Sequence, residues 1–324
     1  MKNLEALLLK LISIKSFSKE EKEIGEFIFN KLAGFGIKKQ IVDKKLERFN
    51  LFVNGNKKSK LWFVAHIDTV KGFPAVKETK DKIFGRGSMD NKTSVACLIS
   101  LIEDWKGKIN VFFTIGEEDD FIGAKFSTKI IPKDSKVIVL EGTEFNKIGS
   151  QRGVITITVK ATGKEEHSSR ATKENCGAII KLMDFIFKLR DKDFSAFNVG
   201  TIIGGTAENI IAGEARAEIA IRPKDNTEFD EVISWVKDLG KKMGVTTTIK
   251  NRIKPFVSAL SKEATGEILC FTEMAFFKNS FLFGAGNINV AHTEKEFIKK
   301  SDLHRLKKEL NLILEKEDRF ITGS

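Results

Sequence analysis

The residues that could do chemistry in this chain lie in five short segments. They are His66 and Asp68 in VAHIDTV, Asp90 in GRGSMDNK, Glu117 and Glu118 in IGEEDD, Glu141 in VLEGTE, and His292 in VAHTEKE. Each segment ends an apolar, strand-like run or lies in the turn just after one, where α/β enzymes present their functional side chains. Neutral imidazoles and carboxylates are ligands for divalent metal ions. As a set, these residues predict a metal-dependent hydrolase with a pair of ions.

The first two segments combine polar residues with a strand end and a glycine turn. His66 and Asp68 are two residues apart, so alternation puts them on the same face of a strand. A carboxylate beside a ligand imidazole commonly accepts its second N–H. Gly85 and Gly87 bracket the turn before Asp90 and allow positive φ angles there. Each pattern alone also fits a satisfied polar pair or an ordinary loop aspartate.

The glutamate pair and the histidines follow the same logic. Glu117 and Glu118 come after the apolar run NVFFTIG, and adjacent carboxylates repel unless a cation or a proton compensates. One of them could bind metal while the other serves as a general base; an acidic surface loop is the alternative. The chain has four histidines. Of these, His304 lies in a charged helical segment and is interpreted as a surface residue.

Length and hydropathy bound the class of protein. With 324 residues, the chain is long enough for two domains of ordinary size. No apolar run reaches the roughly 18–20 residues of a membrane span. The segment LEALLLKLISI is interrupted by Glu5 and Lys10 and is interpreted as an amphipathic helix instead of a signal peptide. These features predict a cytoplasmic protein that makes no membrane contact.

The net charge of +11 comes from lysines spread along the whole chain. There is no basic block interleaved with aromatic residues and no helix-turn-helix or zinc-finger signature, so we expect no nucleic-acid partner. The favoured interpretation is a solvated surface, and the second is an acidic substrate or carrier protein. Three cysteines without a CxxC motif favour buried apolar residues over disulfides. Tyrosine is absent, so no phenol can act as acid, base or oxyanion donor.

Apolar runs at 61–67, 110–116 and 136–142 are predicted strands, with a helix at 95–105. Strands alternating with helices predict an α/β fold with a mostly parallel sheet covered on both faces. Ser18 and Glu21 have the pattern of a capping box that opens a helix to about Leu32. Asn54-Gly55 is a predicted hairpin turn. The apolar stretch 261–277 is predicted to be helical, and a strand-like SFLFGAG and a charged C-terminal helix follow it.

The pattern changes after Gly153. VITITVKATG alternates with a period of two, which is typical of a sheet exposed on one face. Helices at 178–189 and about 229–243, and strands in FNVGTIIGG, EARAEIAIRP and VTTTIKNRI, complete a β-α-β-β-α-β order. We therefore predict an inserted α+β domain at 154–253. The metal-binding catalytic domain is formed by 1–153 and 254–324.

In combination, these motifs resemble the M20 family of dinuclear zinc aminoacylases and peptidases. The HxD, GRGxxDxK, EE, following acidic residue and late AHT occur in the family's order. GKEEHSSR resembles the family's GxxxHSS segment, and GGTAENIIAGEARAEIAIRP resembles its GGxxxNxxP…R segment. The resemblance covers nearly the whole chain. It implies a zinc-peptidase-like catalytic domain and a ferredoxin-like inserted domain that acts as lid and dimerisation domain, and hence a homodimer.

The resemblance implies two Zn²⁺ ions, for which Co²⁺ could substitute. Asp90 would bridge them. His66 and Glu141 would complete the shell of one ion, and Glu118 and His292 that of the other.

The remaining roles are implied in the same way. Asp68 would orient the imidazole two residues before it, and Glu117 would be the general base and later the acid. His167 would reach a partner subunit's active site and stabilise the oxyanion, while Asn209 and Arg222 would contact substrate. In one departure, Glu141-Gly142-Thr143 stands where the family usually has Glu-Pro-Thr, which would loosen that turn and keep the ligand.

The family includes acetylornithine, succinyl-diaminopimelate and acyl-lysine deacylases as well as di- and tripeptidases. The short chain favours a deacylase of amino-acid biosynthesis, acting on a small N-acyl amino acid of the lysine or ornithine type. An acidic carrier protein for that amino acid would suit the charge of +11. The alternative is a dipeptidase or aminopeptidase. A non-catalytic binding protein on the same scaffold would have lost Glu117 or a ligand, and none is lost.

Overall fold

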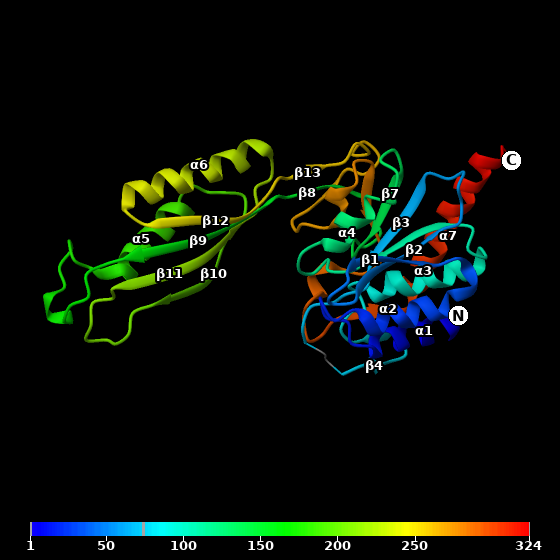
Figure 1. The fold of residues 1–324 in the computed structure, drawn as a ribbon, viewed down its shortest axis with the longest axis horizontal. Coiled ribbons are helices and arrows are strands. Elements are labelled where there is room, and N and C mark those ends of the chain that lie inside the picture. Colours follow the sequence, from blue (N-terminus) through cyan, green and yellow to red (C-terminus); the bar gives the residue numbers. More distant parts are fainter. Residues whose placement is uncertain (1, 73–74, 324) are drawn as a thin grey trace. The chain divides into compact units, whose positions relative to one another are not determined.

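The computed structural model describes residues 2–72 and 75–323, and the chain divides into two units (Figure 1). Unit 1 consists of Met1–Gly149, Ser258–Gly266 and Thr272–Ser324. Unit 2 consists of Ser150–Val257 and Glu267–Phe271.

Most of unit 1 is organised by a nine-stranded sheet with the order β1-β2-β6-β3-β7-β15-β8-β13, with β14 paired to β8. Its strand β13 and parts of β8 and β14 fall within unit 2. The strands are β1 (Lys38–Asp43), β2 (Arg48–Asn54), β3 (Leu61–His66), β6 (Asn110–Thr114), β7 (Lys136–Leu140), β8 (Ile148–Gln151), β13 (Phe256–Val257), β14 (Gly266–Ile268) and β15 (Ser280–Phe283). The neighbours β6-β3-β7-β15 are parallel, whereas β1, β2 and β8 pair antiparallel. The predicted α/β fold class is confirmed, with a mixed sheet that is parallel at its centre.

The register brings the carboxyl ends of the four central strands to one edge. His66 at the end of β3 lies opposite Thr114 at the end of β6. Leu140 at the end of β7 lies opposite Phe283 at the end of β15. Residues that follow these strands in the sequence therefore begin close together in space.

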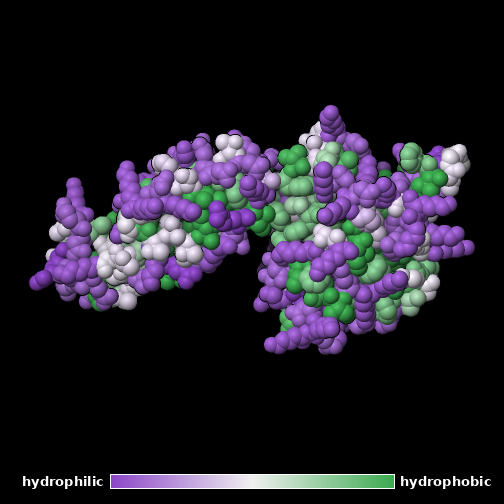
Figure 2. Space-filling model, turned by 45° about the horizontal axis from the view of Figure 1, so that its top comes forward, coloured by the Kyte–Doolittle hydropathy of each residue, from purple (hydrophilic) through white to green (hydrophobic). Residues whose placement is uncertain are grey.

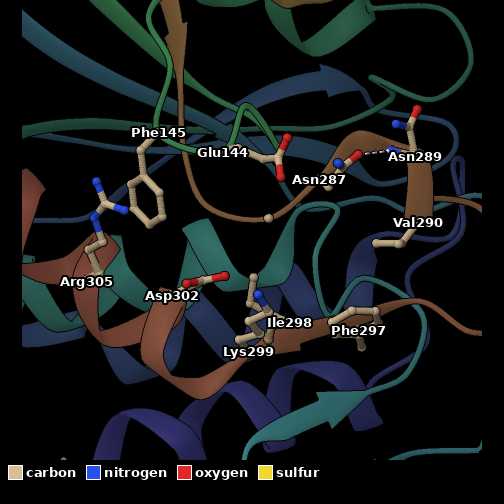
Figure 3. A pocket seen from close by; sticks show the side chains of 11 residues that line it. Glu144, Phe145, Asn287, Asn289, Val290, Phe297, Ile298, Lys299, Asp302 and Arg305 are labelled. Carbon is tan, nitrogen blue, oxygen red and sulfur yellow. Dashed lines mark hydrogen bonds between the residues drawn. The ribbon is translucent and has the colours of Figure 1, made fainter.

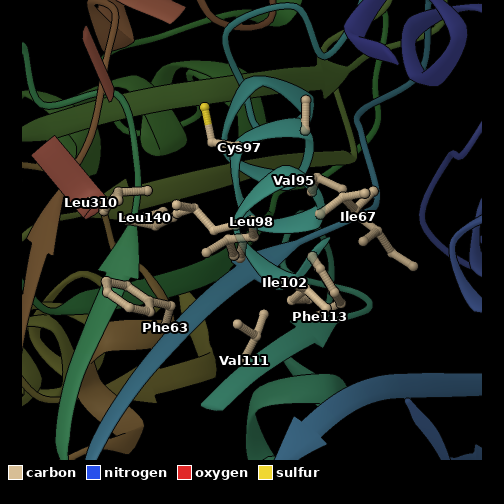
Figure 4. Packing of buried hydrophobic residues seen from close by; sticks show 14 of the residues in the cluster. Phe63, Ile67, Val95, Cys97, Leu98, Ile102, Val111, Phe113, Leu140 and Leu310 are labelled. Atoms are coloured by element: carbon tan, nitrogen blue, oxygen red, sulfur yellow. The ribbon is translucent and has the colours of Figure 1, made fainter. Parts of the chain in front are cut away.

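Helices α1 (Lys2–Ser13), α3 (Lys92–Asp104) and α7 (Lys300–Thr322) pack together and cover one face of this sheet (Figure 4). Phe63 and Leu140 from the strands meet Leu98 and Ile102 of α3 there, all fully buried. Because side chains alternate along a strand, the neighbouring Trp62 points to the opposite face.

The other helical elements of unit 1 are short: α2 (Lys22–Lys31), α4 (Ile122–Ser127), η1 (Ala33–Phe35), η3 (Glu273–Phe276) and η4 (Ile288–Val290). A three-stranded sheet has the order β16-β5-β4, formed by β16 (Phe297–Lys299), β5 (Lys82–Phe84) and β4 (Lys77–Glu78). It joins the segment before α3 to the segment before α7.

Unit 2 has its own four-stranded antiparallel sheet, with the order β10-β11-β9-β12. Its elements are β9 (Val154–Thr162), η2 (Ser168–Arg170), α5 (Gly177–Arg190), β10 (Phe197–Gly204), β11 (Glu214–Ile221), α6 (Asn226–Met243) and β12 (Thr246–Ile253). The inward residues of β9 and β11 alternate with exposed ones and form a second core with α5 and α6. The β-α-β-β-α-β order matches the sequence pattern.

The capping-box prediction at Ser18 is wrong. Helix α2 is preceded by Glu21, which makes no side-chain capping bond to the helix. The Ser18 hydroxyl instead donates to Asp68 Oδ2 at 2.7 Å. Ser18 thus donates to a distant carboxylate, where the pattern suggested that it would accept from a local backbone N–H.

Two further local predictions are also wrong. Asn54-Gly55 ends β2, and the hairpin between β1 and β2 reverses at residues 44–47. The stretch 261–277 is not a helix; it contains turns, β14 and η3. Backbone groups around Gly266 pair with β8 instead of with one another, since Gly266 weakens a helix.

Hydrophilic residues cover most of the visible face of each unit (Figure 2). Within 2–72 and 75–323, no helix combines the length and the apolar character needed to cross a membrane.

We expect substitutions of two leucines of α7 to differ sharply in their effect on the free energy of unfolding. Leu310 is fully buried against α3, whereas Leu312 is 37% exposed. Leu310→Ala should lower the free energy of unfolding by about 2–5 kcal/mol, because it removes buried methyl groups and leaves a cavity. Leu312→Ala is the matched control and should cost far less. Equal losses in denaturant titrations would contradict this description of the core.

Candidate metal centre

The predicted ligands all lie in unit 1, at the carboxyl edge of the parallel strands. They are His66 at the end of β3, Asp90 just before α3, Glu118 after β6, Glu141 after β7, and His292 in the loop after β15. Five residues from distant parts of the sequence are thereby brought to one edge of the sheet.

One group of possible ligand atoms is centred on His66. Its Nε2 lies 3.0 Å from Asp90 Oδ1 and 3.7 Å from Glu141 Oε1. Its Nδ1 lies 3.0 Å from the backbone oxygen of Asp68. That oxygen can only accept, so Nδ1 carries a hydrogen and Nε2 is the atom that faces the two carboxylates. All three side chains of the group are buried.

A second group is centred on His292. Its Nε2 lies 2.9 Å from Glu118 Oε1 and 3.3 Å from Asp90 Oδ2. The two oxygens of Asp90 therefore face different imidazoles, as they would in a carboxylate that bridges two ions. The His292 side chain is 49% exposed, so this group opens to solvent while the first is enclosed.

The distances and donor types in both groups fit divalent metal ions. Tetrahedral zinc with ligand bonds near 2.0–2.2 Å separates its ligand atoms by about 3.3 Å. The observed separations of 3.0, 3.7, 2.9 and 3.3 Å bracket that value. Each group supplies one imidazole and two carboxylates within 4.8 Å of one another. A third combination, of His66 with Glu117 and Glu118, meets the same distance limit.

The carboxylate of Asp68 holds the turn after β6. It accepts hydrogen bonds from the backbone N–H groups of Glu117 at 3.1 Å and Glu118 at 3.2 Å, and from the Ser18 hydroxyl. Its Oδ1 is 3.6 Å from His66 Nδ1, longer than a hydrogen bond. The contact to the imidazole thus comes mainly from the backbone of Asp68, which differs from the carboxylate contact we expected.

The carboxylates at this edge of the sheet are buried and close together, so their negative charges repel unless positive charge compensates. Burial raises the pKa of Glu117 well above its ordinary value, and repulsion from Glu141 and Glu118 adds to the shift. Burial also raises the pKa of Glu141 well above its usual range, and Asp90 raises it further. Protons or metal ions must neutralise part of this charge.

The pKa values of the two imidazoles are raised, whereas burial alone lowers the pKa of a histidine. Burial opposes a charge on His66, but the neighbouring carboxylates of Asp68 and Asp90 raise its pKa well above the ordinary value. Hydrogen bonds to Asp90 and Glu118 raise the pKa of His292 to about 10. In the metal-free protein, protons therefore take the place of cations, and metal binding would release them.

Glu296 supports the turn that carries Asp90, and our sequence analysis missed it. This buried carboxylate accepts backbone N–H groups of Met89 and Asp90, both at 3.1 Å, and pairs with Arg86 Nη1 at 2.6 Å. Its position four residues after His292 was the one available signal. Its burial, which identifies the role, is visible only in the fold.

Glu273 is a second residue that sequence patterns did not reveal. It is fully buried in η3, and its Oε2 accepts the Thr114 hydroxyl at 2.8 Å. Its other oxygen has no hydrogen-bond partner among the described residues. Burial raises the pKa of Glu273 to about 7, and the charge of His66 partly offsets this. A further ionisable carboxyl thus lies behind the strand ends.

The remaining predicted site residues lie in unit 2, at two ends of its sheet. The backbone N–H of Ser168, beside His167, donates to Asn209 O at 2.8 Å. Ser169 N–H donates to His167 Nδ1 at 3.3 Å, so the neutral ring carries its hydrogen on Nε2. Arg222 follows β11 at the opposite end, where its N–H donates to Ala196 O. His167 and Asn209 are thus brought together, and Arg222 is not.

Comparison with known proteins agrees with this geometry. Residues 149–247 match the family model of the peptidase dimerisation domain M20_dimer. A peptidase M20 domain-containing protein of Schizosaccharomyces pombe is 29% identical over 93% of this chain and 81% of its own length. The chain is thus similar to peptidases of the M20 family over nearly its whole length. A probable carboxypeptidase of Aspergillus flavus is 29% identical over 68% of this chain, which spans only 63% of that relative.

Solved structures have the same fold as this chain. A tripeptidase of Staphylococcus aureus has a TM-score of 0.83 with 21% identity, over 98% of both chains. The Bacillus subtilis YXEP protein, described as a dinuclear metal-binding peptidase of the M20 family, has a TM-score of 0.68 with 13% identity, over 94% of this chain and 95% of its own. Together with the similar sequences, they indicate that this chain is a hydrolase acting on peptide or amide bonds.

Zinc should stabilise this protein more at about pH 8 than at about pH 6, because its ligands bind metal only when deprotonated. Without metal, the raised pKa values of Glu273, about 7, and His292, about 10, mean that the folded state binds more protons than the unfolded chain. Its stability therefore falls as the pH rises through these values. The check is the difference in Tm between zinc-loaded and EDTA-treated protein. A difference that stays constant or shrinks with rising pH would contradict the assignment.

Proposed function

We propose that this chain is a dinuclear zinc hydrolase. The observation that carries the proposal is the pair of imidazole–carboxylate groups that share Asp90, with Oδ1 facing His66 and Oδ2 facing His292. In this proposal Asp90 would be shared by the two ions. His66 and Glu141 would hold one of them, and Glu118 and His292 would hold the other.

The reaction proposed is attack of water on the carbonyl of a linear amide bond. Zinc held by these residues would act as a Lewis acid toward the carbonyl and lower the pKa of water. Glu117 takes a proton from the attacking water on its carboxylate and passes it to the leaving amine nitrogen. Its turn is fixed by the hydrogen bond from its backbone N–H to Asp68. Burial raises the pKa of Glu117, which makes its carboxylate a stronger base.

His167 is the proposed donor to the carbonyl oxygen as negative charge develops there. Its Nε2–H is free to donate because Nδ1 accepts from Ser169. The side chain is exposed and lies in a loop of unit 2. Asn209 in the adjoining loop is proposed to contact the same substrate, and Arg222 to contact substrate from the other end of β11.

A homodimer is proposed to bring His167 to a partner's metal centre. The match to a dimerisation domain supports this. So does the exposed apolar surface of unit 2, because β10 is an edge strand on which Ile202 is 53% exposed and Ile203 73% exposed. Helix α5 adds exposed Ile180 and Phe187. An exposed edge strand with such a surface is a ready template for pairing with another chain.

Small peptides are the favoured substrate class. Named relatives and structural neighbours are carboxypeptidases, a tripeptidase and a dipeptidase. The second candidate is the N-acyl amino acid deacylase of lysine or ornithine type that we expected from the sequence. The net charge of +11 supports that candidate, since it would suit an acidic carrier protein.

The function is tested by metal analysis and a substrate panel of di- and tripeptides beside N-acetyl, N-succinyl and γ-glutamyl amino acids. We expect two zinc ions per chain and hydrolysis within the panel. Glu117→Gln should retain zinc yet lose about 100- to 10,000-fold in kcat, the usual contribution of general acid–base catalysis. Glu144→Gln, which changes a glutamate outside the metal groups, is the matched control. Less than one zinc per chain and no hydrolysis of any compound would overturn the proposal.

His167→Ala should lower kcat by about 100- to 1000-fold with zinc content retained, the cost of removing one oxyanion donor. His304→Ala is the matched control, because His304 contacts Glu5 and belongs to neither metal group. Wild-type turnover in His167→Ala would contradict the role.

Mixing the two inactive variants tests whether His167 acts across the dimer. In a mixed dimer, the His167→Ala chain supplies an intact Glu117 and the Glu117→Gln chain supplies an intact His167. One complete site then forms, so activity should return after subunit exchange. A mixture of exchanged subunits that stays inactive would show that His167 does not act in trans.

A further inference from the structure

A cavity of about 500 Å³ lies beside the loops that carry Glu141 and His292 (Figure 3). Its walls come from three segments: Glu144 and Phe145 after β7, the loop 286–290 after β15, and β16 with the start of α7. We call it the Asp302 cavity. Its volume is within the range of sites for small molecules.

The cavity is distinct from the metal centre. None of the five proposed ligands lines it. Met89 lies between the two, since a Cβ on Gly142 would meet Met89 Sδ at 2.4 Å and a Cβ on Gly286 would meet Met89 Cγ at 2.4 Å. The turn leading to Asp90 and the loop after β15 therefore close against each other and separate the two sites.

The wall segment that follows β7 has an unfavourable backbone conformation. Glu144 and Phe145 are consecutive non-glycine residues with φ angles of 51° and 66°. Their N–H groups are held by Gly286 O at 2.9 Å and Gly284 O at 2.7 Å. Left-handed residues of this kind are uncommon and concentrate at ligand-binding positions. Here the conformation turns the Glu144 carboxylate toward the cavity (Figure 3).

Acidic and basic side chains both line the cavity, and few of them form ion pairs. Glu144 and Asp302 supply carboxylates, and Lys299 and Arg305 supply cations. Neither Glu144 nor Lys299 has an ion-pair partner in the described part of the chain. The sole acidic partner of Arg305 among the described residues is Glu309, at a loose 3.8 Å. The walls therefore offer both signs of charge to a ligand.

Apolar surface lies between these charges. The guanidinium of Arg305 is stacked over the Phe145 ring at 3.8 Å, which fixes its position by a cation–π contact. Val290 and Phe297 line the opposite side (Figure 3). This arrangement is complementary to a ligand that carries a positive and a negative group at one end and an apolar group at the other.

We propose that the Asp302 cavity is a second ligand site that takes a free α-amino acid as its zwitterion. The ammonium group lies between Glu144 and Asp302, and the carboxylate meets Arg305 and Lys299. An apolar side chain rests against the aromatic and aliphatic wall. The two carboxylates and two cations sum to zero charge, which disfavours a phosphate or a dication. Free amino acids are also what hydrolysis of small peptides releases, so such ligands accumulate around the enzyme.

The test is calorimetric binding to the zinc-loaded full chain with three probes. L-leucine carries both charges, 3-methylbutylamine lacks the carboxylate, and 4-methylpentanoate lacks the ammonium group. We expect leucine to bind at least about tenfold more tightly than either analogue, because each loses charge-assisted hydrogen bonds.

Variants assign the probes to the cavity. Asp302→Asn should weaken leucine binding about tenfold and remove its advantage over 4-methylpentanoate, because its charge partner is lost. Arg305→Met should remove the advantage over 3-methylbutylamine. Asp318→Asn, the same change on an exposed position of α7 outside the cavity, is the control. Hydrolytic activity should be unchanged in Asp302→Asn, and Glu144→Gln gives the same test on an exposed side chain if that variant does not fold.

Three results would overturn the proposal. The first is the absence of leucine binding to the wild-type chain at millimolar concentration. The second is wild-type leucine affinity in both Asp302→Asn and Glu144→Gln. The third is binding lost only in Glu118→Gln, which would assign the amino acid to the metal centre and leave the cavity without a ligand. None of these depends on whether the substrate is a peptide or an N-acyl amino acid.

Discussion

The constraint on which the rest of unit 1 depends is the concentration of acidic side chains at one sheet edge. Asp90, Glu118 and Glu141 face two imidazoles across 2.9–3.7 Å. Burial makes their charge costly, and the pKa of Glu141 is raised well above its usual range as a result. The fold must hold these groups together against repulsion until cations arrive. The extensive apolar packing of α1, α3 and α7 behind the strands supplies that stability.

Positioning depends on groups outside the proposed ligand set. Glu296 holds the Asp90 turn through two backbone N–H groups, and Asp68 holds the turn after β6 in the same way. Each of these carboxylates is itself fixed by a second contact, to Arg86 and to Ser18 respectively. Such outer partners keep ligands in place at low entropic cost when metal binds. The centre is thus assembled by backbone hydrogen bonds as much as by side chains.

The gathering of the candidate ligands at one edge could be predicted from residue type and strand-end position. Their partners from distant parts of the chain could not. His66 and Glu141 end continuous apolar runs whose length identifies buried strands, so their meeting at one edge follows from a parallel sheet. Ser18 followed a local capping pattern, yet a buried acceptor 50 residues away outcompeted it. Glu273 lay in a stretch that we assigned to a helix from its apolar content alone. Its burial beneath Thr114 comes from the packing of η3 against β15 and α4.

The internal geometry of unit 2 constrains how it can serve a metal centre. His167 and Asn209 adjoin the end of β11 at Glu214, whereas Arg222 follows its other end at Ile221. Eight residues of extended strand separate these ends by about 25 Å, far more than a dipeptide or an N-acyl amino acid spans. One copy of unit 2 therefore cannot place all three side chains on one small substrate. If all three contact substrate, they must do so from two chains, which is a stronger argument for a functional dimer than exposed apolar surface alone.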